Sequence, residues 1–205
     1  MPRLFTTMPP MTTGTKPQIA RIAQMKNQAR RLSPICVLSA ICGLLLSVIP
    51  VSARAAVEHP PQTGPTVPGN KATVSRGRCI PPANAPLAVK KAIWATNYLV
   101  GRPYVWGGGH GTFYDRGYDC SGSVSFLLHH AGALAQPTTS RGLQSYGEPG
   151  PGRWITIYAR AGHTFAIVCG VRLDTTGGTG RDEGPRWRLN DRGPRGFVAR
   201  HPPGM

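Results

Sequence analysis

The feature that most constrains this fold is a helix start in the middle of the 205-residue chain. Apolar or small side chains recur there at helical intervals, in Cys120, Val124, Leu127, Leu128 and Ala131. Asp119 directly precedes the pattern, and Asp is a favoured residue at a helix N-cap. The sequence therefore predicts a helix that begins at about Cys120 and carries this cysteine on its buried face.

A cysteine in the first turn of a helix lies beside free backbone N–H groups and the positive end of the helix dipole. Both stabilise a thiolate, which is the reactive form of cysteine. The same N–H groups can hold an oxyanion. We predict that Cys120 is a nucleophile, and a buried structural cysteine is the alternative that the pattern leaves open.

A cysteine nucleophile needs a base, and His163 is the predicted one. It opens a run over 164–169 that is apolar on both faces, which predicts a central strand. A histidine at the mouth of such a strand can face a cysteine at a helix start. His129 and His130 lie about three turns along the predicted helix and are expected at its surface. His110, in a glycine-rich loop, is a weaker candidate.

The predicted orienting residue for this histidine is Asp174. A third group usually holds the far ring nitrogen of such a base. Gly170 is expected to mark a tight hairpin, after which residues 171–173 return as a strand. Asp174 would then lie beside His163. A surface turn before Thr175 is the alternative interpretation.

The N-terminal quarter has the pattern of a secretory signal peptide. Residues 1–55 hold seven basic residues and no acidic one, and the apolar run 35–51 precedes a small-x-small end. We predict cleavage after Ala55, with Met25 as a possible true start and an uncleaved membrane anchor as the alternative. The mature protein is then periplasmic or extracellular, with no stable membrane span.

The remaining chain divides into three parts. Residues 56–86 carry seven prolines and predict an extended linker. Residues 87–176 form the expected core, which begins with an amphipathic helix from Leu87 and a short strand over 104–106. Residues 177–205 are an Arg- and Gly-rich extension of the same domain.

Cysteine spacing and charge narrow the choice of partners. Cys79 and Cys169 are expected to be core residues or a disulfide pair, and the lack of CxxC spacing predicts no metal site.

Without residues 1–55 the net charge of +16 falls to 17 − 8 = +9. The chain has no basic helix, zinc motif or stacking platform, so we expect no nucleic-acid partner. The remaining charge suits anionic cell-wall polymers.

Together these segments resemble the NlpC family of bacterial cysteine peptidases, a compact branch of the papain-like fold. The matching stretches are Gly101-Arg102-Pro103-Tyr104-Val105-Trp106-Gly107-Gly108, Asp119-Cys120-Ser121-Gly122-Ser123-Val124-Ser125, Thr139-Ser140 and Gly162-His163-Thr164. The resemblance implies an α+β fold in which N-terminal helices pack on a small antiparallel sheet and the catalytic cysteine lies at a helix N-terminus.

The resemblance also implies roles for particular residues. Cys120 would be the nucleophile and His163 the base, with a third polar residue that we assign to Asp174. Tyr104 would lie near the thiol, with Asp119 and Ser121 in the vicinity of the substrate and oxyanion. The family commonly has His, Asn or Gln as the third residue, one position further along, where this chain has Thr175.

The implied activity is hydrolysis of an amide bond in peptidoglycan stem peptides. Family analogy points to the bond between D-glutamate and diaminopimelate, with peptidoglycan or muropeptides as substrates and no cofactor. An amidase or acyltransferase acting on another exported substrate is one alternative. A non-catalytic wall-binding module is another.

Overall fold

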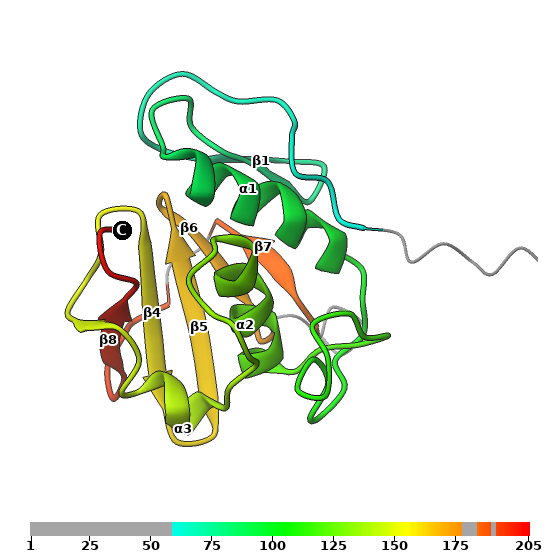
Figure 1. The fold of residues 1–205 in the computed structure, drawn as a ribbon, viewed down its shortest axis with the longest axis vertical. Helices are drawn as coiled ribbons and strands as arrows, with labels where there is room; N and C mark the ends of the chain where they lie inside the picture. The colour runs from blue at the N-terminus through cyan, green and yellow to red at the C-terminus, as the bar shows by residue number, and fades with distance from the viewer. Residues whose placement is uncertain (1–58, 178–183, 190–191) are drawn as a thin grey trace, which may run out of the picture. The chain divides into compact units, whose positions relative to one another are not determined.

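The computed structural model describes residues 59–177, 184–189 and 192–205. These residues form a mixed helix and sheet fold, which confirms the α+β class (Figure 1). The predicted signal peptide, its cleavage site and the possible start at Met25 lie outside the described residues. Within the described ranges, no helix is long and apolar enough to cross a membrane.

The larger sheet has six strands, and all its pairings are antiparallel. Its order is β3-β8-β4-β5-β6-β7. The strands are β3 (Glu148–Pro149), β4 (Ile155–Arg160), β5 (His163–Val168), β6 (Val171–Asp174), β7 (Arg186–Arg188) and β8 (Val198–His201). The C-terminal extension therefore adds β7 beside β6 and β8 beside β4, within the same sheet as the predicted core.

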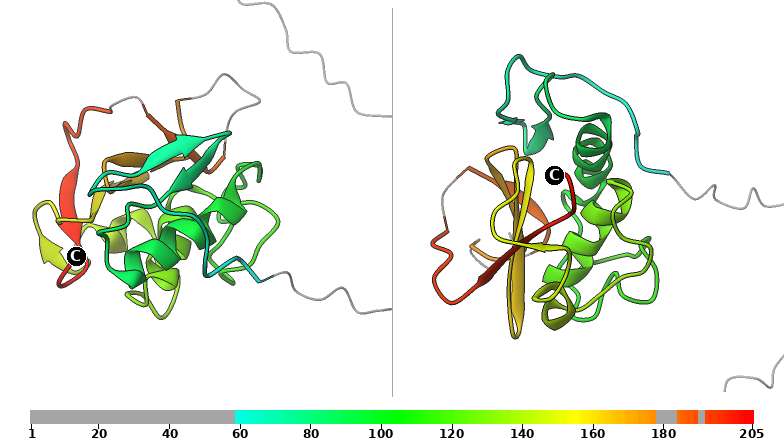
Figure 2. Two further views of the ribbon diagram at one scale, coloured as in Figure 1. Left: turned by 90° about the horizontal axis from the view of Figure 1, so that it is seen from above. Right: turned by 60° about the vertical axis from the view of Figure 1, so that its left-hand side comes forward.

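The helices cover one face of this sheet, as Figure 2 shows. They are α1 (Leu87–Thr96), the short 3-10 helix η1 (Asn97–Leu99), α2 (Cys120–His130) and α3 (Ser140–Leu143). The predicted helix from Leu87 is thus present, and it ends before Gly101, whose φ of +92° is readily adopted by glycine. α2 begins at Cys120, as the periodicity predicted.

The hydrophobic core lies between α2 and the sheet. Alternate residues of neighbouring strands share the helix-facing side, because Ile157 pairs with Ala166 and Ala166 with Leu173. All three belong to one buried cluster with Val124 and Leu127 of α2. This packing holds α2 against β5 and β6.

The opposite face of the sheet is covered by the C-terminal extension. Phe165 is fully buried there, between the rings of Tyr158 and Phe197 at centroid distances of 5.0 and 5.1 Å. In Figure 2 the segment that leads into β8 lies on the side of the sheet away from the helices. The Arg-rich tail is therefore a structural layer of the domain.

The prediction of an extended linker over 56–86 is corrected by the structure for residues 59–86. This segment forms a small hairpin of β1 (Thr73–Ser75) and β2 (Arg78–Ile80). Cys79 of β2 is only 1% exposed, and the Asn97 side chain bonds both its backbone N–H and its carbonyl. Proline tolerates extended backbone, so a proline-rich segment can pack in this way without forming a helix.

Two further expectations are settled by local geometry. Residues 104–106 are not a strand, since only an isolated bridge joins Tyr104 to Tyr118.

Cys79 and Cys169 are both buried free thiols in the structure, as expected for core residues. Burial raises the pKa of Cys169 to about 12. Burial and the neighbouring Cys169 raise the pKa of the Cys79 thiol even more. Neither thiol is therefore ionised near neutral pH.

Candidate active site

The Asp-Cys-Ser-Gly segment is shaped by a close contact with the glycine-rich loop. The Asp119 N–H donates to the Gly108 carbonyl at 3.2 Å, and the Asp119 carboxylate accepts from Gly107 N at 3.1 Å. A Cβ placed on Gly122 would collide with the same Gly108 carbonyl oxygen. Glycine at position 122 thus lets the loop lie directly against the first turn of α2.

Cys120 stands at the start of α2, at the edge of a cleft. Asp119 caps the helix, and its Oδ1 accepts from Gly122 N at 2.7 Å. Cys120 is 7% exposed and helps to line a cleft of about 380 Å³. The cleft is also lined by Tyr104, Trp106, His110, Ser121, Thr139 and Ser140. The thiol is therefore largely buried but lies against the cleft.

The hairpin between β5 and β6 brings Asp174 to His163. Cys169 and Gly170 have φ values of +50° and +87°, which closes a two-residue turn that pairs Val168 with Val171. Continuing this register places Asp174 on the same face of the sheet as His163. His163 Nε2 lies 3.2 Å from Asp174 Oδ1, and both side chains are buried.

His163 interacts with Cys120 as well as with Asp174. Burial alone would lower the pKa of His163. Hydrogen bonds to Asp174 and Cys120 and their negative charges outweigh burial and raise it to about 9. Because Nε2 is bound to Asp174, Nδ1 is the ring nitrogen left for the thiol. The three predicted residues Cys120, His163 and Asp174 therefore lie in one connected group.

The Asp174 carboxylate has several partners besides His163. Its Oδ1 also accepts from the backbone N–H and the hydroxyl of Thr176, at 3.0 and 3.1 Å. Its Oδ2 lies 3.1 Å from Arg192 Nη1 and 3.6 Å from Arg172 Nε. Burial would raise the pKa of Asp174, but the hydrogen bonds to His163 and to the Thr176 backbone N–H, together with the charges of His163 and Arg192, hold it below the usual value of 3.8.

We predict that the His163 interactions stabilise the fold in a pH-dependent way. The folded pKa of about 9 exceeds the ordinary value of 6.5. The stabilisation is therefore fully present below pH 6.5 and is lost as the pH rises through about 9. The loss should be about 3 kcal/mol, measured by urea unfolding across this range.

A His163→Gln variant is the matched reference for that experiment, since it lacks this titration and keeps a polar side chain. The difference in unfolding free energy between the two proteins should shrink as the pH rises. An unchanged difference from pH 6 to pH 10 would contradict the assigned pKa.

The structure places His110 closer to the site than the sequence indicated. Its Nε2 lies 3.1 Å from both Asp119 Oδ1 and Ser121 Oγ, on either side of Cys120 in the chain. Since the carboxylate only accepts, Nε2 must carry the proton. In the sequence, the only indication that His110 could lie near Cys120 is its place in the glycine-rich loop. No periodic pattern predicts this position.

The remaining cleft residues are consistent with a substrate groove. Tyr104 is 39% exposed and Trp106 is 87% exposed, so two aromatic side chains stand at the rim beside Cys120. Ser121, predicted in the oxyanion vicinity, lines the same cleft. Within the described residues, no group of three or more His, Cys, Asp and Glu could hold a metal ion.

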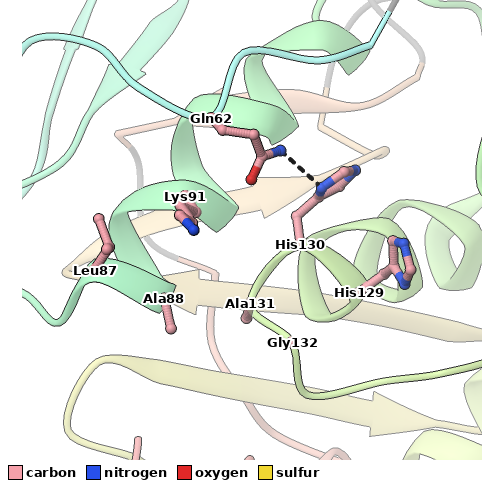
Figure 3. A pocket seen from close by; sticks show the side chains of 8 residues that line it. All are labelled: Gln62, Leu87, Ala88, Lys91, His129, His130, Ala131 and Gly132. Atoms are coloured by element: carbon pink, nitrogen blue, oxygen red, sulfur yellow. Dashed lines mark hydrogen bonds between the residues drawn. The ribbon is translucent and has the colours of Figure 1, made fainter.

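A second hollow, of about 350 Å³, lies at the other end of α2 (Figure 3). There His130 Nδ1 lies 3.2 Å from Gln62 Nε2, and His129 Nδ1 lies 3.2 Å from the Leu134 carbonyl. Burial and the neighbouring His129 lower the pKa of His130 to about 4. Both histidines are half-buried rather than at the surface, and neither belongs to the Cys120 cleft.

In comparisons with known proteins, no family model and no curated protein matches this chain.

Proposed function

We propose that the protein is an exported cysteine hydrolase with a papain-like fold of the NlpC type, which cleaves an amide bond in peptidoglycan stem peptides. One observation carries the proposal. A cysteine at the first position of a helix interacts with His163, which is itself held by a buried Asp174. Nucleophile, base and orienting group in this order are the parts that cysteine-based acyl transfer requires.

The proposed reaction begins with transfer of the Cys120 proton to His163. The thiolate attacks the amide carbonyl and a tetrahedral intermediate forms. Asp119 already occupies the amides of Gly122 and Ser123, which leaves those of Cys120 and Ser121 for the oxyanion. The imidazolium then protonates the leaving amine, and water deprotonated by His163 hydrolyses the acyl-enzyme.

Asp174 supports both halves of this cycle. Its bond to Nε2 fixes the imidazole ring so that Nδ1 faces the thiol. Its negative charge stabilises the imidazolium that forms when Cys120 ionises. Asp174 therefore favours the charged form of His163 that the first step produces.

The choice of substrate rests on the family resemblance of the sequence and on the predicted export signal. An exported cysteine hydrolase of this type meets the wall peptides, and the bond between D-glutamate and diaminopimelate is the proposed target. The aromatic rim at Tyr104 and Trp106 offers contact area for a bulky, partly apolar substrate.

Purified peptidoglycan tests this function directly. Incubation with the mature protein should release fragments whose masses place a new amino group on diaminopimelate. Protein whose thiols have first been alkylated is the control and should release none. Cleavage at another amide would support the amidase alternative, and intact peptidoglycan that still binds the protein would support a non-catalytic wall module.

A further inference from the structure

The carboxylate of Asp174 contacts positively charged side chains in addition to His163, the proposed base. Its side chain is fully buried, and besides His163 it contacts two arginines. Arg172 belongs to β6 itself, whereas Arg192 comes from the C-terminal extension, eighteen residues further along the chain. The extension therefore reaches the interior of the candidate site.

Arg192 is held in place by several contacts. Its Nη1 donates to Asp174 Oδ2 at 3.1 Å and also to the Thr176 hydroxyl. Its guanidinium lies 5.5 Å from the Phe165 ring centroid and 5.7 Å from that of Phe197. Contact with two aromatic rings restricts the guanidinium and its N–H donors to one orientation. Arg192 is therefore preorganised to bind the Asp174 carboxylate.

We infer that Arg192 is a positioning residue for the Cys120–His163–Asp174 group, which holds and neutralises Asp174 while His163 changes its charge. The inference rests on the proposed function, because it assigns Arg192 a part in the same reaction. It assigns to the C-terminal extension a role in the chemistry in addition to its place in the sheet.

The catalytic cycle explains why such a partner is needed. His163 is positively charged in the thiolate pair and neutral after it protonates the leaving amine. A buried carboxylate with too little positive charge around it is costly, and without Arg192 only Arg172, at 3.6 Å, would compensate Asp174 at each neutral stage. The Arg192 charge is permanent and keeps the carboxylate ionised throughout the cycle.

The charges around His163 determine whether its pKa rises or falls when Arg192 is replaced by an uncharged residue. Thr176 donates twice to Oδ1, so the carboxylate stays beside the imidazole when Arg192 is removed. Its charge then acts on the imidazolium with less opposition, and the pKa of His163 should rise. Among the residues that the structure describes, the other ionisable or charged groups near His163 and Asp174 are Cys120 on α2, Arg160 on β4, Arg172 on β6 and Arg186 on β7.

Alkylation of Cys120 by iodoacetamide tests the inference without any substrate. The full chain is treated at pH 4 to 11, and the rate at Cys120 is read by mass spectrometry of its peptide. Reactivity of the thiolate changes when the neighbouring imidazolium loses its proton, so the upper step of the profile follows His163. Arg192→Gln should move this step up by about 0.5 to 1 pH unit.

Three companion variants make the result specific. Arg192→Lys keeps the charge and should restore most of the parent profile. Arg195→Gln changes an exposed arginine of the same segment and should leave the profile unmoved. In an Asp174→Asn background, Arg192→Gln should no longer shift the upper step, because the charge on which it acts has gone.

The outcomes separate this inference from the proposed function. A parent protein whose Cys120 is unreactive at mildly acidic pH would remove the activated thiol, and with it the proposed function. A reactive parent with an unmoved or lowered upper step in a folded Arg192→Gln variant would overturn the role of Arg192 alone. Far-ultraviolet circular dichroism establishes that the variant is folded.

Discussion

We expect that replacing Cys120 by alanine abolishes the proposed peptidoglycan hydrolysis while the protein remains folded. The expected loss of kcat is at least about 10³-fold, since no other group can form the acyl-enzyme. The fold should survive, because the thiol lies at the edge of a cleft and its removal leaves only a small cavity. Product release from purified peptidoglycan measures the first effect, and urea unfolding measures the second.

Cys79 supplies the matched control for this substitution. It is a buried thiol with no contact to the cleft, so Cys79→Ala should keep its activity and lose about 1–2 kcal/mol of stability. A Cys120→Ala protein that retains a tenth of the parent activity would exclude Cys120 as the nucleophile and would assign the hydrolysis to another group.

The helix start at Cys120 could be predicted because all of its determinants are local. The capping Asp119 and the spacing of buried side chains along α2 lie within a dozen consecutive residues. The pairing of His163 with Asp174 was accessible for a similar reason. A two-residue turn at Cys169 and Gly170 fixes the register of the adjoining strands, so the pairing depends on sequence distance alone.

The contacts that the sequence did not predict depend on chain segments that lie far apart. The position of His110 follows from the loop that lies against Gly122, which no periodic pattern encodes. Arg192 meets Asp174 only because β8 crosses to the far side of β4. The packed hairpin within 59–86 was hidden by its prolines, whose composition resembles that of a linker.

These long-range contacts change how the candidate site is understood. In the proposed function Cys120 and His163 carry the chemistry, and a local sequence motif marks each of them. The electrostatic balance of the site instead depends on Asp174 and on arginines that include one from the C-terminal extension. Activity should therefore depend on a segment that the motif alone would treat as dispensable.

Asp174→Ala should be the most destabilising substitution in this site. Removing the carboxylate leaves Arg172, which is 5% exposed, and the half-buried Arg192 without their shared anion. Breaking a buried charge pair from one side costs about 3–5 kcal/mol, which urea unfolding at pH 7 would reveal. Asp174→Asn keeps the shape and some hydrogen bonds, so it should lose less.

The pH dependence of this loss identifies its origin as the carboxylate charge. The folded pKa of Asp174 lies below 3.8, so its contribution is complete above the unfolded value and is lost as the pH falls through the folded one. The gap in unfolding free energy between parent and Asp174→Ala should therefore narrow in acid. A gap that stayed constant down to the lowest pH at which both proteins fold would assign the loss to packing.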